Sequence, residues 1–119
     1  MTKLRITLCF LLAVMTLLGS AHALTIRVAP QALVLSSEGG RLTVHTDVPI
    51  GEAEEVFLAV NGFNTAIVMF ADSLGNLVAQ CDKHDVEEAI GEFEGKWTTA
   101  TVTLTVNGES ASETISVKK

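Results

Sequence analysis

The side chains that could act in catalysis are few and widely separated in this sequence. After residue 23 the only histidines are His45 and His84, and no serine occupies the Gly-x-Ser-x-Gly context of a nucleophile elbow. Nucleophilic hydrolysis needs a base and an orienting acid beside the nucleophile, and no spacing here indicates such a triad. We therefore predict a non-catalytic protein, with a minimal enzyme as the remaining alternative.

Metal ligands are also sparse. Calcium takes six to eight oxygen ligands, several of them from one loop, and zinc needs at least three convergent protein ligands. The segment 72–76 offers Asp72 and Asn76, and Asp82 is the next carboxylate along the chain. These three residues are the candidate ligands, but they are too few, so we predict an ordinary polar turn, no metal and no cofactor. The alternative is a small extracytoplasmic metal- or ligand-binding protein with a calcium-like loop at Asp72.

Threonine alternates strictly with apolar residues in the segment 99–106. This period of two predicts a strand with one apolar face and one polar face. The polar face is uncharged and made of β-prone side chains, so it is a candidate surface for a partner strand or sheet, with a plain solvated face as the alternative. The candidate binding residues are Thr99, Thr101, Thr103 and Thr105, together with Phe63, which lies beside an Asn-Gly turn. The partner we expect is a protein or a cell-surface component.

Asn107-Gly108 interrupts this strand with the dipeptide that most favours a tight hairpin. A second alternating run follows, with Ile115 and Val117 on its apolar side. Pairing Val106 with Glu109, or with Ala111, keeps both of these residues on the apolar face, whereas pairing it with Ser110 would turn them to water. We therefore expect a terminal hairpin with a two-residue or a four-residue loop.

Further strands are predicted for the segments 25–28, 32–35, 41–48, 56–60, 65–71 and 77–81. The run 65–71 is apolar on both faces, which predicts a central or covered strand. Asp82 to Ile90 predicts one short helix, with Asp82 as its N-cap and Gly91 at its C-terminal end. Most of the aromatic side chains are expected in the core. The pattern as a whole predicts an all-β protein, an immunoglobulin-like antiparallel β-sandwich of about seven strands with one short connecting helix.

The N-terminus has the pattern of a signal peptide. Lys3 and Arg5 precede an apolar run of about a dozen residues, which is shorter than a membrane-spanning helix. Ala21-His22-Ala23 supplies small residues for cleavage after Ala23. We expect a signal peptide at 1–23, one domain at 24–119, and a secreted or periplasmic location with no membrane insertion after cleavage.

The chain is acidic, with a formal net charge of −6, and it has no basic cluster. This charge argues against binding to nucleic acid or to anionic membranes. Removal of the signal leaves Cys81 as the single cysteine, so no disulfide forms within the domain. Cys81 is expected either buried as a small hydrophobe or paired between molecules, and the protein is expected to be a monomer or a weak homo-oligomer.

The order of motifs resembles a known family. Immunoglobulin-like modules of secreted bacterial and archaeal surface proteins read Pro-x-x-Leu-x-Leu-x-Ser-x-Gly, then a Val-Asn-Gly turn, an Asp/Gly loop, a helix opening with Asp-Lys, and a closing Thr-Leu-Thr-Val-x-Gly. This chain has the corresponding residues at 30–39, 60–62, 72–75, 82–86 and 103–108, although its Asp/Gly loop has fewer aspartates. The resemblance implies a structural or adhesive unit with an immunoglobulin-like fold.

Overall fold

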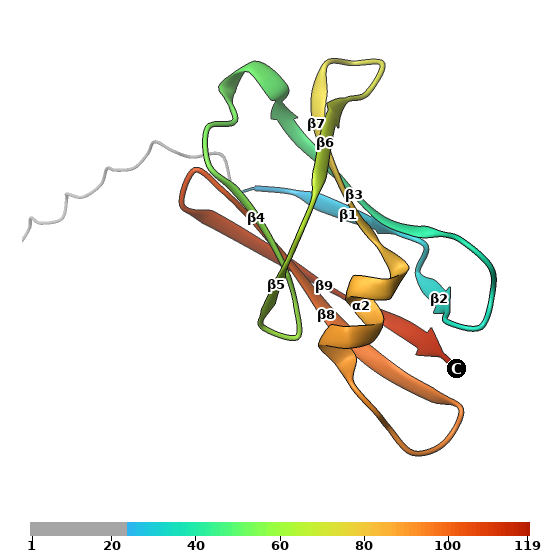
Figure 1. Ribbon diagram of the computed structural model, residues 1–119. Coiled ribbons are helices and arrows are strands. Elements are labelled where there is room, and N and C mark those ends of the chain that lie inside the picture. The colour runs from blue at the N-terminus through green and yellow to red at the C-terminus, as the bar shows by residue number, and fades with distance from the viewer. Residues whose placement is uncertain (1–23) are drawn as a thin grey trace, which may run out of the picture.

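The computed structural model describes residues 24–119, so the predicted signal peptide at 1–23 lies outside the described residues. The described chain forms nine strands, one α-helix and one short 3-10 turn (Figure 1). In order along the chain they are β1 (Ile26–Ala29), β2 (Ala32–Val34), β3 (Arg41–Pro49), η2 (Ile50–Glu52), β4 (Val56–Val60), β5 (Phe63–Thr65), β6 (Val68–Ala71), β7 (Asn76–Asp82), α2 (Lys83–Ile90), β8 (Trp97–Val106) and β9 (Glu109–Lys118).

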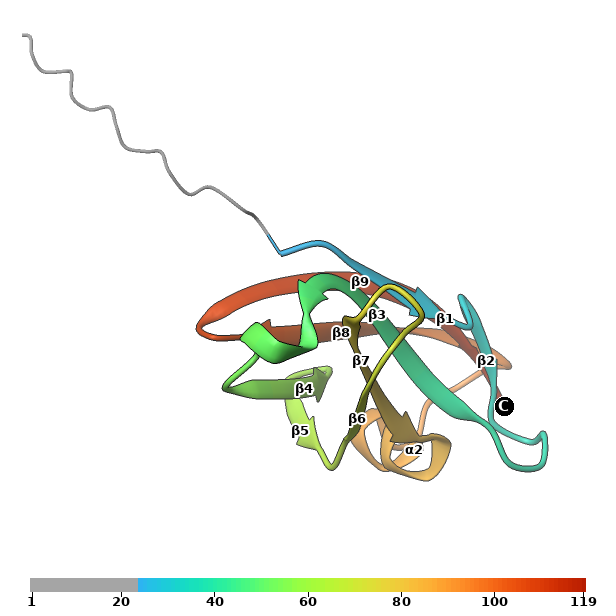
Figure 2. The ribbon, with the colours of Figure 1, turned by 90° about the horizontal axis from the view of Figure 1, so that it is seen from above.

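The strands form two sheets, and the expectation of an all-β protein is confirmed. One sheet has four strands in the order β1-β3-β7-β6, and the other has five in the order β2-β9-β8-β4-β5. All neighbouring strands are antiparallel except β2 and β9, which run parallel. In the view of Figure 2, β3 of the four-stranded sheet passes across β8 and β9 of the five-stranded sheet. Pro30 lies between β1 and β2, which join different sheets.

The terminal hairpin has one of the two registers that the sequence leaves open. Val106 pairs with Glu109, so the loop has two residues. Both of them have positive φ, 51° at Asn107 and 88° at Gly108, which suits the right-handed twist of the flanking strands. Ile115 and Val117 are consequently buried on the same face as Val102.

The core between the sheets is aliphatic. Its largest fully buried side chains include Leu42 on β3, Leu77 on β7, Leu58 on β4 and Leu104 on β8. The expectation that most aromatic residues lie in the core is wrong, because no aromatic side chain of residues 24–119 is buried. Aromatic rings occupy strand edges, outer faces and loops instead, because Val and Leu side chains fill the space between the sheets.

The segment 65–71 is not one central strand. The chain leaves the five-stranded sheet after β5, which pairs with β4, and enters the four-stranded sheet as β6, which pairs with β7. Two strands, β5 and β6, therefore replace the single one expected, and the described chain has nine strands where about seven were predicted. β6 lies at the edge of its sheet, and all four of its residues are exposed. The strand is therefore apolar on both faces, as its sequence indicates, but it is not buried on both faces.

Helix α2 covers one end of the molecule, where it contacts β3, β4, β5 and β7. Val86 is fully buried, and Ala89 and Ile90 pack against the core, as the sequence predicts. Gly91 ends the helix with a φ of 73°. Asp82 occupies the N-cap position but makes no capping hydrogen bond, and its carboxylate lies 3.8 Å from Arg41 Nε on β3 instead. Within residues 24–119 no helix is long and apolar enough to cross a membrane.

Candidate binding surface

The outer face of the five-stranded sheet carries a continuous array of hydroxyl groups. On β8 the buried residues are Ala100, Val102, Leu104 and Val106, so the alternating threonines point outward. The register of the hairpin places a serine or threonine of β9 directly opposite each of them. The four pairs, here called the hydroxyl face, are Thr99 with Ser116, Thr101 with Thr114, Thr103 with Ser112, and Thr105 with Ser110.

Two of these pairs are hydrogen bonded through their side chains. Thr103 Oγ1 lies 2.7 Å from Ser112 Oγ, and Thr105 Oγ1 lies 2.6 Å from Ser110 Oγ. In each pair one hydroxyl donates and the other accepts, so the accepting hydroxyl keeps its own proton for a further bond. Each pair therefore presents a donor and free acceptor lone pairs to solvent without any charge.

An aromatic side chain marks each end of the hydroxyl face. Trp97 begins β8 on the outward side, is 53% exposed, and lies under the ammonium of Lys118 at 5.8 Å from the ring centroid. Phe57 on β4 is also 53% exposed and pairs in register with Thr105 at the opposite end. At about 3.4 Å per residue, the face from Trp97 to Thr105 is about 27 Å long.

Phe63, the other candidate binding residue, lies on a different part of the surface from the candidate threonines. Phe63 pairs with the inward-facing Val60, and it lies beside Asp85 and Ala89 of helix α2, away from the hydroxyl face. It is 63% exposed, as expected for a residue beside the Asn-Gly turn. One of the two aromatic residues that do share the surface, Phe57, was missed, although its position between the inward-facing Val56 and Leu58 predicts an outward side chain.

The serines of β9 were also missed as members of this surface. The pairing of Val106 with Glu109 was one of the two registers open from the sequence, and it places Ser110 and Ser112 beside threonines. The signal was therefore present in the sequence, but only the structure shows that these β9 side chains are exposed, with no element of residues 24–119 over them.

The three candidate metal ligands do not converge. Asp72 closes a tight turn, because its Oδ1 accepts the N–H of Leu74 at 2.8 Å and of Asn76 at 3.0 Å. Asp82 lies at the other end of β7, which at about 3.3 Å per residue is about 20 Å away from Asn76. Among residues 24–119 no group of three or more histidine, cysteine, aspartate or glutamate side chains is arranged to hold a metal ion.

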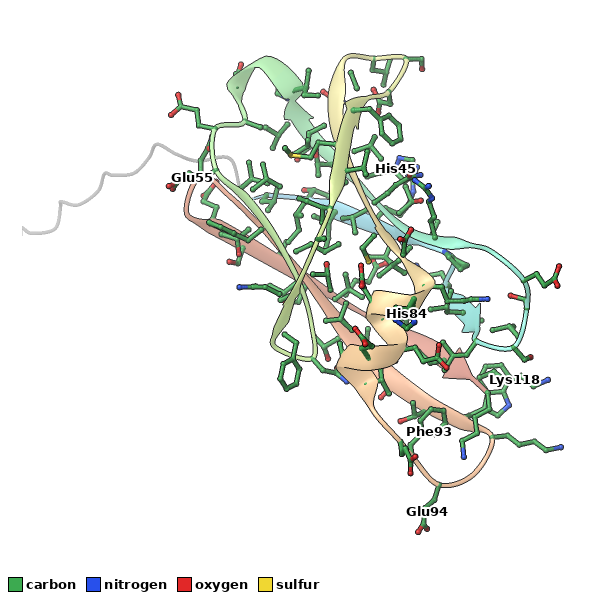
Figure 3. All side chains as sticks on the ribbon, in the orientation of Figure 1. His45, Glu55, His84, Phe93, Glu94 and Lys118 are labelled. Carbon is green, nitrogen blue, oxygen red and sulfur yellow. The ribbon has the colours of Figure 1, made fainter. Side chains whose placement is uncertain are left out.

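The potentially reactive side chains are similarly dispersed. His45 on β3 and His84 on α2 belong to separate elements, and His84 Nε2 lies 3.5 Å from Glu88 of its own helix (Figure 3). Cys81 is only 3% exposed and is a free thiol. The pKa of its thiol is raised to about 11, chiefly by burial and to a lesser extent by the carboxylates of Asp85 and Asp82, against a hydrogen bond with Thr65 that lowers it. Such a thiol is protonated and unreactive at neutral pH.

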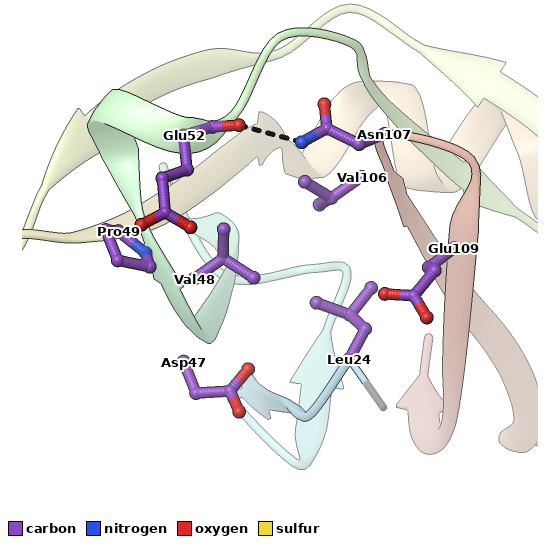
Figure 4. A pocket seen from close by; sticks show the side chains of 8 residues that line it. All are labelled: Leu24, Asp47, Val48, Pro49, Glu52, Val106, Asn107 and Glu109. Carbon is purple, nitrogen blue, oxygen red and sulfur yellow. Dashed lines mark hydrogen bonds between the residues drawn. The ribbon is translucent and has the colours of Figure 1, made fainter. Parts of the chain in front are cut away.

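A cavity of about 440 Å³ opens near the first described residue, Leu24 (Figure 4). Three carboxylates line it, those of Asp47, Glu52 and Glu109, along with apolar side chains. Asn107 forms one wall and donates from Nδ2 to the Glu52 carbonyl at 2.7 Å. The residues lining this cavity include no histidine, lysine, serine or cysteine, so they offer acceptors for a cation or an amine but no nucleophile.

The chain was compared with known proteins, and neither a protein-family model nor a curated protein matches it.

Proposed function

We propose that the protein is a secreted, non-catalytic module that associates with a protein or a cell-surface component through the hydroxyl face. The observation that carries this proposal is the row of four paired hydroxyls, bounded by exposed Phe57 and Trp97. Aromatic side chains are enriched at interfaces, where they contribute a large share of the binding energy. The hydroxyl groups between them can donate or accept hydrogen bonds.

The charge distribution supports association through this face. The chain has a net charge of −6, yet the eight residues of the hydroxyl face carry no charge. Burying a charged group at an interface costs far more than burying a hydroxyl that finds a partner. A partner that covers the hydroxyl face therefore avoids the desolvation of the carboxylates, which lie on other parts of the molecule.

An immunoglobulin-like fold is part of the proposal. The four-stranded order β1-β3-β7-β6 corresponds to strands A, B, E and D of that fold, and the series β9-β8-β4 corresponds to G, F and C. On this assignment β5 takes the place of C′, and β2 adds a parallel strand beside G. Secretion is proposed from Lys3, Arg5 and the apolar run before Ala23.

A sedimentation experiment tests the function. The protein, labelled with a fluorophore at its C-terminus, is mixed with the insoluble cell-envelope fraction of the producing organism and centrifuged. We expect the native protein to sediment with the envelope, and the double variant Thr101→Lys/Thr103→Lys to remain in solution. The matched control is Thr43→Lys, a half-buried threonine on the outer face of the four-stranded sheet, which should sediment like the native protein.

The proposal is wrong if the native protein stays in solution, or if the double variant sediments as well as the control. A thermal unfolding curve of each variant shows whether it is folded, so a loss of sedimentation through unfolding is distinguished from a loss of binding.

A further inference from the structure

We propose that edge strand β6 pairs with β6 of a second copy, so that two molecules form a symmetric, concentration-dependent dimer. This surface belongs to the four-stranded sheet and is separate from the hydroxyl face. The two-fold axis passes between Met69 of one copy and Met69 of the other, and the two four-stranded sheets join into one continuous sheet across it.

The exposed side chains of β6 are apolar. Val68 is 55% exposed, Met69 51% and Phe70 41%, although large hydrophobic residues are normally buried on at least one side of a sheet. Phe70 and Val68 share the outer face with their register partners on β7, Val78 and Gln80. Met69 pairs with Ala79, whose side chain faces the core, so Met69 lies on the inner side at the margin of the sheets.

This edge lacks the features by which edge strands are normally protected. Natural edges carry charges or prolines, contain bulges, or are very short. β1 carries Arg27, and β2 and β5 have three residues each. β6 has four residues, no charge and no proline, and its register with β7 has no shift.

The backbone groups of β6 determine how a second copy would bind. The N–H of Asp72 donates to the carbonyl of Asn76 at 2.9 Å, so this pair is hydrogen bonded. Hydrogen-bonded and non-bonded pairs alternate along antiparallel strands, and Phe70 and Val68 therefore bond to β7. The N–H and C=O groups of Met69 and Ala71 point away from β7, toward the open edge.

A symmetric antiparallel pairing satisfies these groups. With Met69 opposite Met69 of the partner copy, the two residues exchange both of their N–H···O bonds, and Ala71 falls opposite Ile67. The same register sets Val68 against Phe70 of the second copy on the outer face, and the reverse by symmetry. Aromatic and β-branched residues are favourable cross-strand neighbours, and such reciprocal contact is the signature of a two-fold interface.

Charge favours a second copy as the occupant. Two acidic chains repel one another wherever their carboxylates approach. The electrostatic cost of a close contact is therefore lowest where neither surface carries a charge. Residues 56–71 form the longest segment without a charged residue in the described chain, and β6 lies at its end. Two copies can therefore pair along this edge without setting charged side chains of β6 against one another.

The area of the contact determines its strength. Three half-exposed side chains and one short strand on each copy bury less than the roughly 1,200–2,000 Å² of a standard stable interface. We therefore expect a dimer that forms and dissociates with concentration, not an obligate one.

Analytical ultracentrifugation of residues 24–119 between about 5 and 500 µM tests the pairing. We expect the weight-average mass to rise from that of the monomer toward twice that value. Met69→Lys and Met69→Glu each place like charges opposite one another on the two-fold axis, and each should weaken association by about tenfold or more. An equimolar mixture of the two variants should associate again, because the opposite charges then meet.

The native protein remaining monomeric at the highest concentration would overturn the proposal. So would a dimer that persists in both single variants, or a mixture of the variants that stays monomeric. Thr101→Lys/Thr103→Lys is the matched control: it alters the hydroxyl face only and should leave the dimer intact. The dimer is measured without the envelope fraction, so its outcome is independent of the proposed function.

Discussion

Asn61 and Thr101 complete the ladder between β4 and β8 by an exchange that involves a side chain. The N–H of Asn61 donates to the Thr101 carbonyl at 2.9 Å, and the N–H of Thr101 donates to Asn61 Oδ1, also at 2.9 Å. Asn61 has a φ of 51°, as the first residue of its tight turn requires. One asparagine thus supplies both the turn conformation and an acceptor that the turned backbone can no longer provide.

Two substitutions at this position separate these contributions. Asn61→Gly keeps the positive φ and loses the acceptor, so we expect a loss of about 1 kcal/mol in the free energy of unfolding. Asn61→Ala also adds the strain of a left-handed residue, about 1–2 kcal/mol more. Urea unfolding measures both values. Equal stability of the glycine variant and the native protein would show that the Thr101 N–H does not depend on this acceptor.

Glu113 on β9 is expected to tie the two sheets together, because its side chain bonds to β1 of the other sheet. Its Oε1 accepts the N–H of Val28 at 2.9 Å and the side-chain amide of Gln31 at 2.8 Å. Glu113→Ala should cost about 1–3 kcal/mol, because the buried N–H of Val28 loses its acceptor. Glu113→Gln keeps an oxygen in place and should cost less. Thermal and urea unfolding of the three proteins measure the order, and an alanine variant as stable as the glutamine variant would contradict it.

The buried thiol of Cys81 makes stability depend on pH at the alkaline end. Burial raises its pKa from 9.0 to about 11, so between these values the unfolded chain loses a proton that the folded chain keeps. This contribution to stability is fully present below pH 9 and falls as the pH rises toward 11, by about 2–3 kcal/mol in total. Cys81→Ala removes this component, and the difference between the two pH profiles measures it.

The same burial predicts slow chemistry at Cys81. At pH 8 the native thiol should react with a disulfide reagent only through opening of the fold, whereas the unfolded chain should react at once. Stopped-flow absorbance with and without urea makes the comparison. Rapid reaction in the native state would show that the thiol is accessible.

Leu104 and Leu58 face each other in register on β8 and β4, and both are at most 1% exposed. Leu104→Ala should destabilise the protein by about 2–5 kcal/mol through lost burial and the cavity left behind. Thr105→Ala, one residue further and on the outer face, should cost less than about 1 kcal/mol. Denaturant unfolding compares the two, and similar losses would contradict the alternation of β8.

The sequence alone was sufficient where neighbouring residues specify the structure. The alternation in β3 and β8, the position of a tight turn at Asn107-Gly108 and the end of α2 at Gly91 follow from side-chain period and local φ, whereas the choice between a two-residue and a four-residue loop came from the structure. The same alternation correctly predicts that Thr99, Thr101, Thr103 and Thr105 point outward.

Only the tertiary structure decided which strands are covered. The apolar segment 65–71 has the composition of a central strand, but sheet order places β6 at an edge and leaves Phe70 exposed. The same order brings Phe57 beside Thr105 and leaves Phe63 near α2. The two-residue alternation along a strand predicts which side chains share a face. What lies over that face depends on contacts between residues distant in the chain, which no local pattern encodes.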